Sequence, residues 1–101
     1  MFYIYILYSL ASDKYYIGYS NNAHRRLIEH NSKQINSFTS KHRPWILKAL
    51  FSVGEIEKDA VRIERFLKKQ KSRKLIEKLC DKSFIPSGDL AQMVRVPHMR
   101  D

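Results

Sequence analysis

Apolar and aromatic residues dominate the start of the chain, in two stretches joined by a short polar link. The stretches are residues 3–7 and 15–19, and the link is residues 9–14. Residues of these types favour strands, and two such stretches around a short polar link predict a β-hairpin. Neither face of the first stretch is polar, so this strand is expected to be central in a sheet and covered on both sides.

Two tyrosines of the predicted hairpin lie where their hydroxyl groups can meet. On the second strand Tyr16 and Gly18 share one face, because side chains alternate along a strand. If the strands pair with Tyr5 near Tyr16, two phenol groups converge over a spot that Gly18 leaves open. A glycine inside a strand often marks close approach by a ligand or another backbone, so this spot is a candidate site.

A helical pattern follows the hairpin. An asparagine at position 21 or 22 can cap a helix over residues 23–30. In that helix Arg26 and His30 lie one turn apart, at the edge of the apolar stripe expected to face the sheet. The polar residues 31–44 then predict a loop, and residues 45–51 predict a third strand.

The second half of the chain predicts two helices and a tail. A long helix is expected from Glu55, and Ser72 can cap a shorter helix after it. The apolar stripe of the long helix consists of Ile56, Ala60, Ile63 and Leu67. Residues 88–101 show no clear period, so they are expected to form a loosely held tail behind a domain over residues 1–87.

The predicted order of elements is therefore β-β-α-β-α-α. A length of 101 residues suggests one small domain with one core. The expected fold is α/β in the broad sense (α+β), with a small three-stranded sheet, mixed or antiparallel, flanked by helices.

Net charge narrows the range of partners. Nineteen Lys and Arg face ten Asp and Glu, which gives a net charge of +9. A small domain this basic usually meets a polyanion, and DNA is the expected partner. A merely soluble basic protein is one alternative. Binding to an anionic membrane is disfavoured, because no helix combines a basic face with a broad bulky apolar one.

Composition also argues against several other classes of site. One cysteine, Cys80, allows no internal disulfide and fits a reducing cytoplasm, where the protein is expected to act. The four histidines show no zinc-binding pattern. The sequence contains no Gly-rich phosphate loop, so no small-molecule cofactor is expected. No apolar run reaches the ~20 residues of a membrane span, and the apolar N-terminus lacks the basic flank of a signal peptide. The oligomeric state stays open.

The hairpin resembles the signature of the GIY-YIG nuclease family. Residues 3–5 correspond to the first triplet, with Tyr3 where the family name has glycine, and residues 16–18 match the second. The resemblance covers about residues 2–80 and is strongest to the small stand-alone bacterial members with a single domain. It implies an endonuclease that hydrolyses phosphodiester bonds in DNA. Selectivity for DNA structure and a link to DNA repair or recombination are expectations of the same origin.

The same resemblance implies a set of catalytic residues. Family members carry an arginine in the first helix, a histidine one turn later and a glutamate in the next long helix. Together with the hairpin tyrosines, the matching positions here are Tyr5, Tyr16, Arg26, His30 and Glu64. Many family nucleases also carry an asparagine shortly after the glutamate helix, whereas residues 68–74 here are rich in lysine instead.

Phosphodiester cleavage gives these residue types chemical reasons to lie together. Glu64 can hold one Mg²⁺ (or Mn²⁺), a hard ion that favours oxygen ligands and stabilises a leaving oxygen. Arg26 can bond two phosphate oxygens through its planar fork. Tyr5 can position or deprotonate the attacking water, with support from Tyr16 and His30. A base role requires a pKa below the ~10 of a free phenol or a relay to another group, and the sequence leaves open which group takes the proton.

Each of these residues also has a purely structural interpretation. Taken singly, the two tyrosines are core aromatics with hydrogen-bonded hydroxyls, and His30 is a surface or capping histidine. Glu64 alone predicts an ion pair with Arg65 or Lys68. The order of all five along the chain favours the active-site interpretation.

Further cations are expected to follow the DNA backbone. Residues 68–74 hold five cations in seven positions. The predicted nucleic-acid-binding residues are Gly18, Arg25, Lys41, Arg43, Lys68, Lys69, Lys71, Arg73 and Lys74. Two rival functions stay open: a non-catalytic nucleic-acid-binding module of the same fold, and a basic protein-interaction domain.

Overall fold

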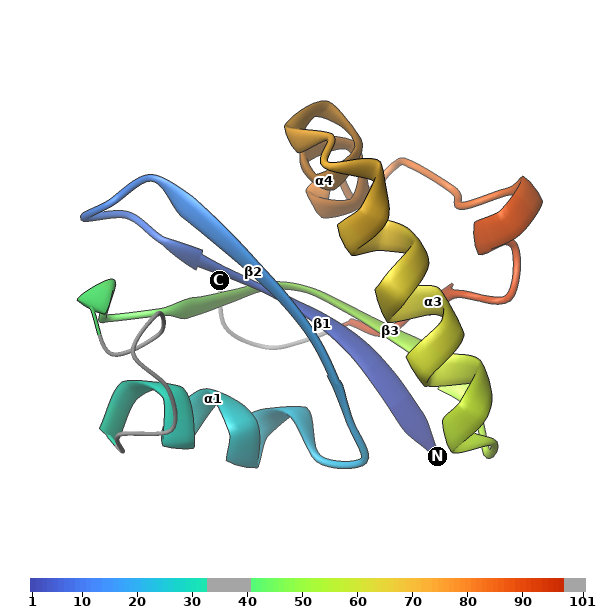
Figure 1. The fold of residues 1–101 in the computed structure, drawn as a ribbon, viewed down its shortest axis with the longest axis horizontal. Coiled ribbons are helices and arrows are strands. Elements are labelled where there is room, and N and C mark those ends of the chain that lie inside the picture. Colours follow the sequence, from blue (N-terminus) through green and yellow to red (C-terminus); the bar gives the residue numbers. More distant parts are fainter. Residues whose placement is uncertain (33–40, 98–101) are drawn as a thin grey trace.

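The computed structural model describes residues 1–32 and 41–97, which form an antiparallel sheet with helices on both faces (Figure 1). The sheet order is β2-β1-β3-β4. In chain order the elements are β1 (Phe2–Ser9), β2 (Lys14–Ser20), α1 (Ala23–Ser32), β3 (Ile46–Gly54), α3 (Glu57–Gln70), α4 (Arg73–Cys80), the 3₁₀ turn η1 (Gly88–Leu90) and β4 (Val94–Arg95). The α+β class is confirmed, but the sheet has four strands where the sequence predicts three, because the C-terminal segment adds β4.

Strand β1 lies between β2 and β3, as its apolar pattern on both faces predicts. Alternation along the strand sends Ile4 and Ile6 into the core under α3 and α4, and sends Tyr5 and Leu7 toward α1. All four side chains are buried. The sheet therefore separates two layers of helices, with α1 on one face and the α3–α4 pair on the other (Figure 1).

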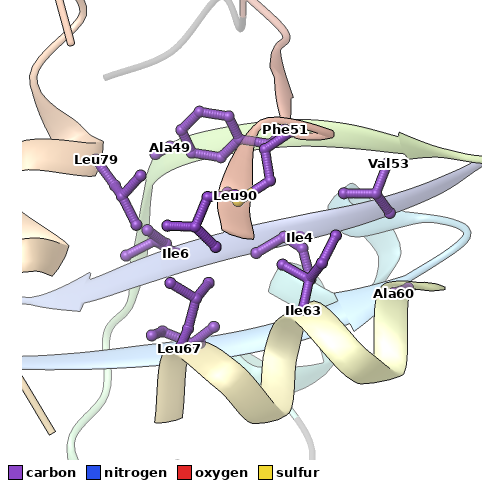
Figure 2. Packing of buried hydrophobic residues seen from close by; sticks show 12 residues of the cluster. Ile4, Ile6, Ala49, Phe51, Val53, Ala60, Ile63, Leu67, Leu79 and Leu90 are labelled. Carbon is purple, nitrogen blue, oxygen red and sulfur yellow. The ribbon is translucent and has the colours of Figure 1, made fainter. Parts of the chain in front are cut away.

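The larger core lies between the sheet and α3 (Figure 2). Ala60, Ile63 and Leu67 are buried at the spacing that the sequence predicts. Full burial of an Ile or Leu side chain contributes about 1.5–3 kcal/mol, so this stripe is the main reason that α3 docks. Ile56 does not belong to the stripe: it is the N-cap residue of α3 and is 59% exposed, because the helix begins after it.

Helix α1 begins where the sequence predicts and runs two residues further. The side chain of Asn22 accepts a hydrogen bond from the main-chain N–H of Arg25, which makes Asn22 the cap. The helix continues to Ser32, so the predicted loop starts later than position 31. Most of that predicted loop, residues 33–40, lies outside the described residues.

Helix α4 follows α3 after a sharp turn. The Ser72 hydroxyl accepts a hydrogen bond from the N–H of Leu75, which confirms the predicted cap. Cys80 at the end of α4 is half-buried, and burial raises the pKa of its thiol to about 11, so it is an unreactive packing residue at neutral pH. Within the described chain, no helix is both long enough and apolar enough to span a membrane.

Residues 88–95 pack against the sheet, whereas the sequence predicts a loosely held tail over residues 88–101, of which 98–101 lie outside the described residues. Leu90 and Met93 are buried in the larger core, and β4 pairs with β3. The Arg95 guanidinium donates to the main-chain carbonyls of Leu79, Asp81 and Phe84. Sequence periodicity misses this segment because a single 3₁₀ turn and a two-residue strand have no repeat to detect.

Truncation after Ser87 is expected to lower the melting temperature by more than about 10 °C. It removes two buried apolar side chains, worth about 1.5–3 kcal/mol each, and 1 kcal/mol shifts the melting temperature of a domain of this size by about 4–8 °C. Leu90→Ala alone is expected to cause part of the loss. A thermal melt followed by circular dichroism measures both; an unchanged transition in the truncated protein would contradict the packing of this segment.

A candidate active site at the edge of the sheet

A polar cleft of about 470 Å³ lies at the outer edge of β2. Residues of α1 and α3 both line it, although these helices cover opposite faces of the sheet. Because β2 is the edge strand, side chains from the two faces can meet around it without crossing the sheet. The lining residues are Phe2, Tyr5, Tyr16, Gly18, Tyr19, Ser20, Asn21, Arg26, Glu57 and Glu64.

Gly18 is the residue that lets a tyrosine of the central strand reach this cleft. The strand register sets Tyr5 opposite Gly18 and Leu7 opposite Tyr16, so the two tyrosines lie diagonally on one face and not directly opposite each other. A Cβ atom at position 18 would clash with the Tyr5 ring and its hydroxyl oxygen. Only glycine therefore allows the Tyr5 phenol to pass over β2 toward the edge, which is the open spot that the sequence predicts.

His30 packs beside the two tyrosines in the interior. Its ring is fully buried, its Nε2 lies 3.2 Å from the Tyr5 hydroxyl oxygen, and its ring meets the Tyr16 ring edge-on at 5.0 Å between centroids. Burial, followed by the nearby Arg26 cation, lowers the pKa of His30 to about 4, so the imidazole is neutral at pH 7. The interpretation of His30 as a surface or capping histidine is therefore wrong.

The hydroxyl of Tyr5 is also neutral at physiological pH. Burial raises its pKa above that of a free phenol, and the Arg26 cation only partly opposes this effect. The cation-rich surroundings thus do not create a resting phenolate. Tyr5, which lines the cleft, instead forms a neutral hydrogen-bonded pair with the fully buried His30.

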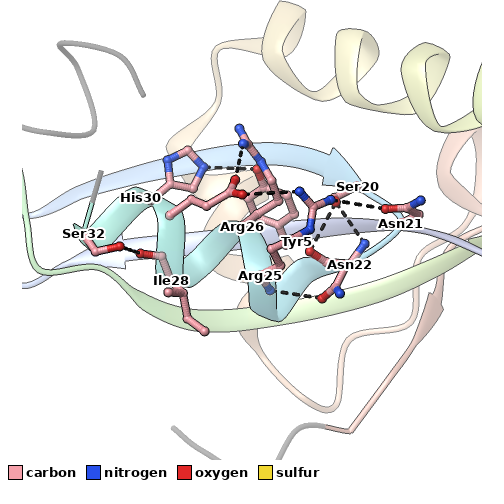
Figure 3. A network of polar contacts seen from close by, with 10 residues as sticks. Tyr5, Ser20, Asn21, Asn22, Arg25, Arg26, Ile28, His30 and Ser32 are labelled. Atoms are coloured by element: carbon pink, nitrogen blue, oxygen red, sulfur yellow. Dashed lines mark hydrogen bonds and ion pairs between the residues drawn. The ribbon is translucent and has the colours of Figure 1, made fainter. Parts of the chain in front are cut away.

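Arg26 is held at the cleft by a carboxylate of its own helix (Figure 3). Its Nη1 lies 2.7 Å from Oε1 of Glu29, one turn further along α1. The guanidinium in turn lowers the pKa of Glu29. Arg25 also reaches Glu29, at 3.3 Å, and donates to the side chain of Asn21 at the cleft. Glu29 was not predicted as a site residue, although its spacing from the two arginines was a readable signal.

Glu64 enters the cleft from α3. Its side chain is 18% exposed, and its Oε2 lies 3.2 Å from Nζ of Lys68. Of the two partners that the sequence suggests, Lys68 is the one the structure pairs with it. The Lys68 ammonium also lies 5.4 Å from the centroid of the Tyr16 ring, so Lys68 contacts both the Glu64 carboxylate and a tyrosine of the hairpin.

Comparison with known proteins identifies the family to which the chain belongs. A family model described as the GIY-YIG catalytic domain matches residues 1–77. This chain belongs to the GIY-YIG family. A "UPF0213 protein" of Limosilactobacillus reuteri (strain DSM 20016) is 33% identical over 81 residues, which cover 79% of this chain and 83% of that relative. Membership of the GIY-YIG family implies nuclease activity with DNA as the substrate.

Five residues that line the cleft are not predicted site residues, namely Phe2, Tyr19, Ser20, Asn21 and Glu57, and two of them are bonded to each other. The Tyr19 hydroxyl donates to Oε2 of Glu57 at 3.0 Å, and both residues line the cleft. Strand alternation places Tyr19 on the face opposite Tyr16, so its sequence position argues against a shared site. Only the position of β2 at the sheet edge brings these residues together.

The predicted DNA-binding cations are spread over several surfaces. Lys41, Lys69, Lys71 and Lys74 are exposed. The Arg73 guanidinium is already bonded to Asp13 and Glu77, and the Arg43 side chain donates to the main-chain carbonyl of His30. Arg43 and Arg73 thus have structural partners in this GIY-YIG domain.

A fall in pH from 6.5 to 4 is expected to destabilise the domain through His30, whose pKa burial lowers from 6.5 to about 4. In this window the unfolded chain binds a proton that the folded state does not, so stability is lost as the pH falls. His30→Gln should flatten the dependence of melting temperature on pH. His24→Gln, which removes an exposed imidazole from the same helix, should keep the wild-type profile. Equal slopes for both variants would contradict the assignment to His30.

Proposed function

We propose that this protein is a metal-dependent endonuclease that hydrolyses phosphodiester bonds in DNA at the β2-edge cleft. One observation carries the proposal: Arg26 and Glu64, from helices on opposite faces of the sheet, line the same cleft as Tyr5 and Tyr16. A guanidinium, a carboxylate and two hydroxyl groups are a sufficient set to bind a phosphate, hold a hard cation and orient a water.

Glu64 is the proposed metal ligand. The described residues hold no group of three or more His, Cys, Asp and Glu side chains that would cage an ion. One ligating carboxylate in a polar, open cleft that Glu57 also lines fits Mg²⁺ or Mn²⁺, which keep several waters and bind through one or two carboxylates and the substrate phosphate. When bound, the ion would act as a Lewis acid that stabilises the leaving oxygen. Lys68 must give up part of its ion pair with Glu64 to admit the ion.

Arg26 is the proposed phosphate-binding residue. Its fork can donate two parallel hydrogen bonds to phosphate oxygens, and charge on those oxygens grows in the transition state. Glu29 holds the guanidinium in place before substrate arrives, which reduces the entropy lost on binding. Glu29 is therefore a proposed positioning residue.

Tyr5 is proposed to orient the attacking water, with His30 and Tyr16 behind it. The raised pKa of Tyr5 argues against a resting phenolate as the base. The low pKa of His30 likewise argues against this imidazole as the final proton acceptor. An orienting role fits better: the Tyr5 hydroxyl donates to Nε2 of the neutral His30, 3.2 Å away, which leaves the phenol oxygen to accept a hydrogen bond from the water. This arrangement requires the imidazole tautomer with its proton on Nδ1.

The cations around the cleft are proposed to follow the DNA backbone. Lys68 and Arg25 flank the cleft, Lys69 lies in the last turn of α3, and Lys71 and Lys74 extend the basic surface beyond its end. The predicted contacts of Arg43 and Arg73 are weaker candidates, because their guanidinium groups already have protein partners.

A cleavage screen tests the proposal. Branched, nicked, flapped and duplex DNA are incubated with Mg²⁺, with Mn²⁺ or with a chelator, and nicking is expected on at least one form only when a metal is present. Preference for a branched form would link the protein to DNA repair or recombination. Binding without cleavage would favour a non-catalytic module instead, and the absence of salt-sensitive DNA binding would favour a protein-interaction domain.

A further inference from the structure

A second hollow, of about 450 Å³, lies beside the cleft, between β2 and the junction of α3 and α4. We call it the junction groove. It is lined by Asp13, Lys14, Tyr15, Tyr16, Ile17, Leu67, Lys68, Lys71, Ser72, Arg73 and Ile76. Tyr16 lines both hollows, and Lys68 of the junction groove pairs with Glu64 of the cleft, so the junction groove adjoins the proposed site of cleavage.

The junction groove combines apolar and aromatic side chains with cationic ones. Aromatic and aliphatic side chains line it, among them Tyr15, Tyr16 and Ile76, and the exposed lysines 14, 68 and 71 surround them. Duplex DNA offers phosphates at its surface but keeps its bases stacked inside. An apolar hollow with aromatic rings beside cations instead matches an unpaired nucleotide, whose base stacks on a ring while its phosphate meets a cation.

Lys71 adds an independent observation. It ends α3 in the left-handed conformation, with φ 49° and ψ 38°. Glycine is the usual residue at such a helix end, because a side chain is disfavoured there. Residues held in sparsely populated backbone conformations concentrate at functional sites. Lys71 therefore supplies a cation to the junction groove at a position where glycine would make the helix end more stable.

Arg73 forms a wall of the junction groove. Its guanidinium joins Asp13 in the hairpin turn to Glu77 in α4, and it lies 5.1 Å from the centroid of the Tyr15 ring. These contacts tie the hairpin tip to α4 across the groove. The groove is therefore built before any ligand arrives, which lowers the cost of binding.

We propose that the junction groove accepts the base of an unpaired DNA nucleotide next to the phosphate that is cut. The protein then prefers DNA with a single-stranded segment at the point of cleavage. The position of the cut phosphate rests on the proposed function, whereas binding of the unpaired base rests on the groove alone.

The test uses the wild-type protein in a chelator, so that binding is measured without cleavage. Oligonucleotides carrying one 2-aminopurine, a fluorescent adenine analogue that is quenched by stacking, are titrated as single strands and as duplexes. Quenching is expected only with single strands. Tyr15→Leu should lower single-strand affinity by about tenfold or more, since base–aromatic stacking is worth ~1–3 kcal/mol per base, and should leave duplex affinity near wild type.

Lys71→Gly keeps the test decisive even if Tyr15→Leu fails to fold. For single strands, it should reduce the steepness of log affinity plotted against log salt concentration by about 0.7, the value for one phosphate contact. It should not lower the melting temperature. Lys58→Ala removes the same charge from the other end of α3, outside the junction groove, and should change neither slope nor quenching.

The outcomes separate this inference from the proposed function. Unquenched 2-aminopurine, wild-type single-strand binding by Lys71→Gly, or equal losses of single-strand and duplex affinity in Tyr15→Leu would overturn the inference. Quenching with the expected variant effects would support it even if no DNA form were cut, in which case only the endonuclease proposal would fail.

Discussion

Glu64→Gln is expected to abolish metal-dependent cleavage while leaving DNA affinity and melting temperature near those of the wild type. The amide keeps the shape of the side chain but removes the charge that a hard dication requires. DNA affinity rests on the cations and should persist or rise slightly, because one negative charge is lost. Loss of the partly exposed pair with Lys68 should change stability by no more than about 1 kcal/mol. Cleavage rates and binding isotherms on the same DNA measure both effects.

Glu57→Gln is the matched control for this variant. Glu57 lies on the same helix and lines the same cleft, but its carboxylate accepts from Tyr19 and is more exposed. A smaller effect on cleavage is expected, because only Glu64 matches the glutamate of the family pattern. Cleavage by Glu64→Gln at the wild-type rate would show that the metal assignment is wrong, and loss of cleavage in Glu57→Gln alone would move that assignment to Glu57.

Arg26→Ala is expected to lower the cleavage rate by about 10²-fold or more, the typical loss for one transition-state donor. The loss should appear mainly in kcat, because charge on the phosphate oxygens grows as the bond breaks. Arg26→Lys keeps the charge but loses the planar fork, so it should recover only part of the rate. Single-turnover cleavage with saturating protein measures the chemical step directly.

Arg25→Ala is the comparison that isolates the role of Arg26. Arg25 is its neighbour in α1 and pairs with the same Glu29, but its side chain is 53% exposed against 27% for Arg26. Its loss should weaken DNA binding and raise KM with little change in kcat. Equal effects of the two alanine variants on kcat would mean that the phosphate is held by the pair and not by Arg26.

Local sequence was enough to predict most helices and the family of the chain. The apolar spacing of Ala60, Ile63 and Leu67 predicts the buried stripe of α3, and Ser72 caps α4 as its hydroxyl predicts. These features depend on residues within one or two turns of each other, so they can be read from the chain directly. The signature residues of the hairpin likewise predicted GIY-YIG membership, which the family model confirms.

Errors arose wherever long-range contacts decide the outcome. Residues 88–95 lack a period but pack through Leu90, Met93 and Arg95 against distant strands and loops. Its polarity does not predict that His30 of α1 is fully buried against Tyr5 of β1. In both places the partner lies far away along the chain, and no local pattern encodes it.

The sequence alone determined which residue types are present, their faces on each strand and helix, and the strongly basic charge. Only the tertiary structure decided that Arg26 of α1 and Glu64 of α3 line one cleft, because the two helices cover opposite faces of the sheet. They meet because β2 is an edge strand, and because Gly18 has no side chain to block the Tyr5 phenol. Strand order and register depend on the pairing of whole strands, so these two facts become visible only when the sheet is assembled.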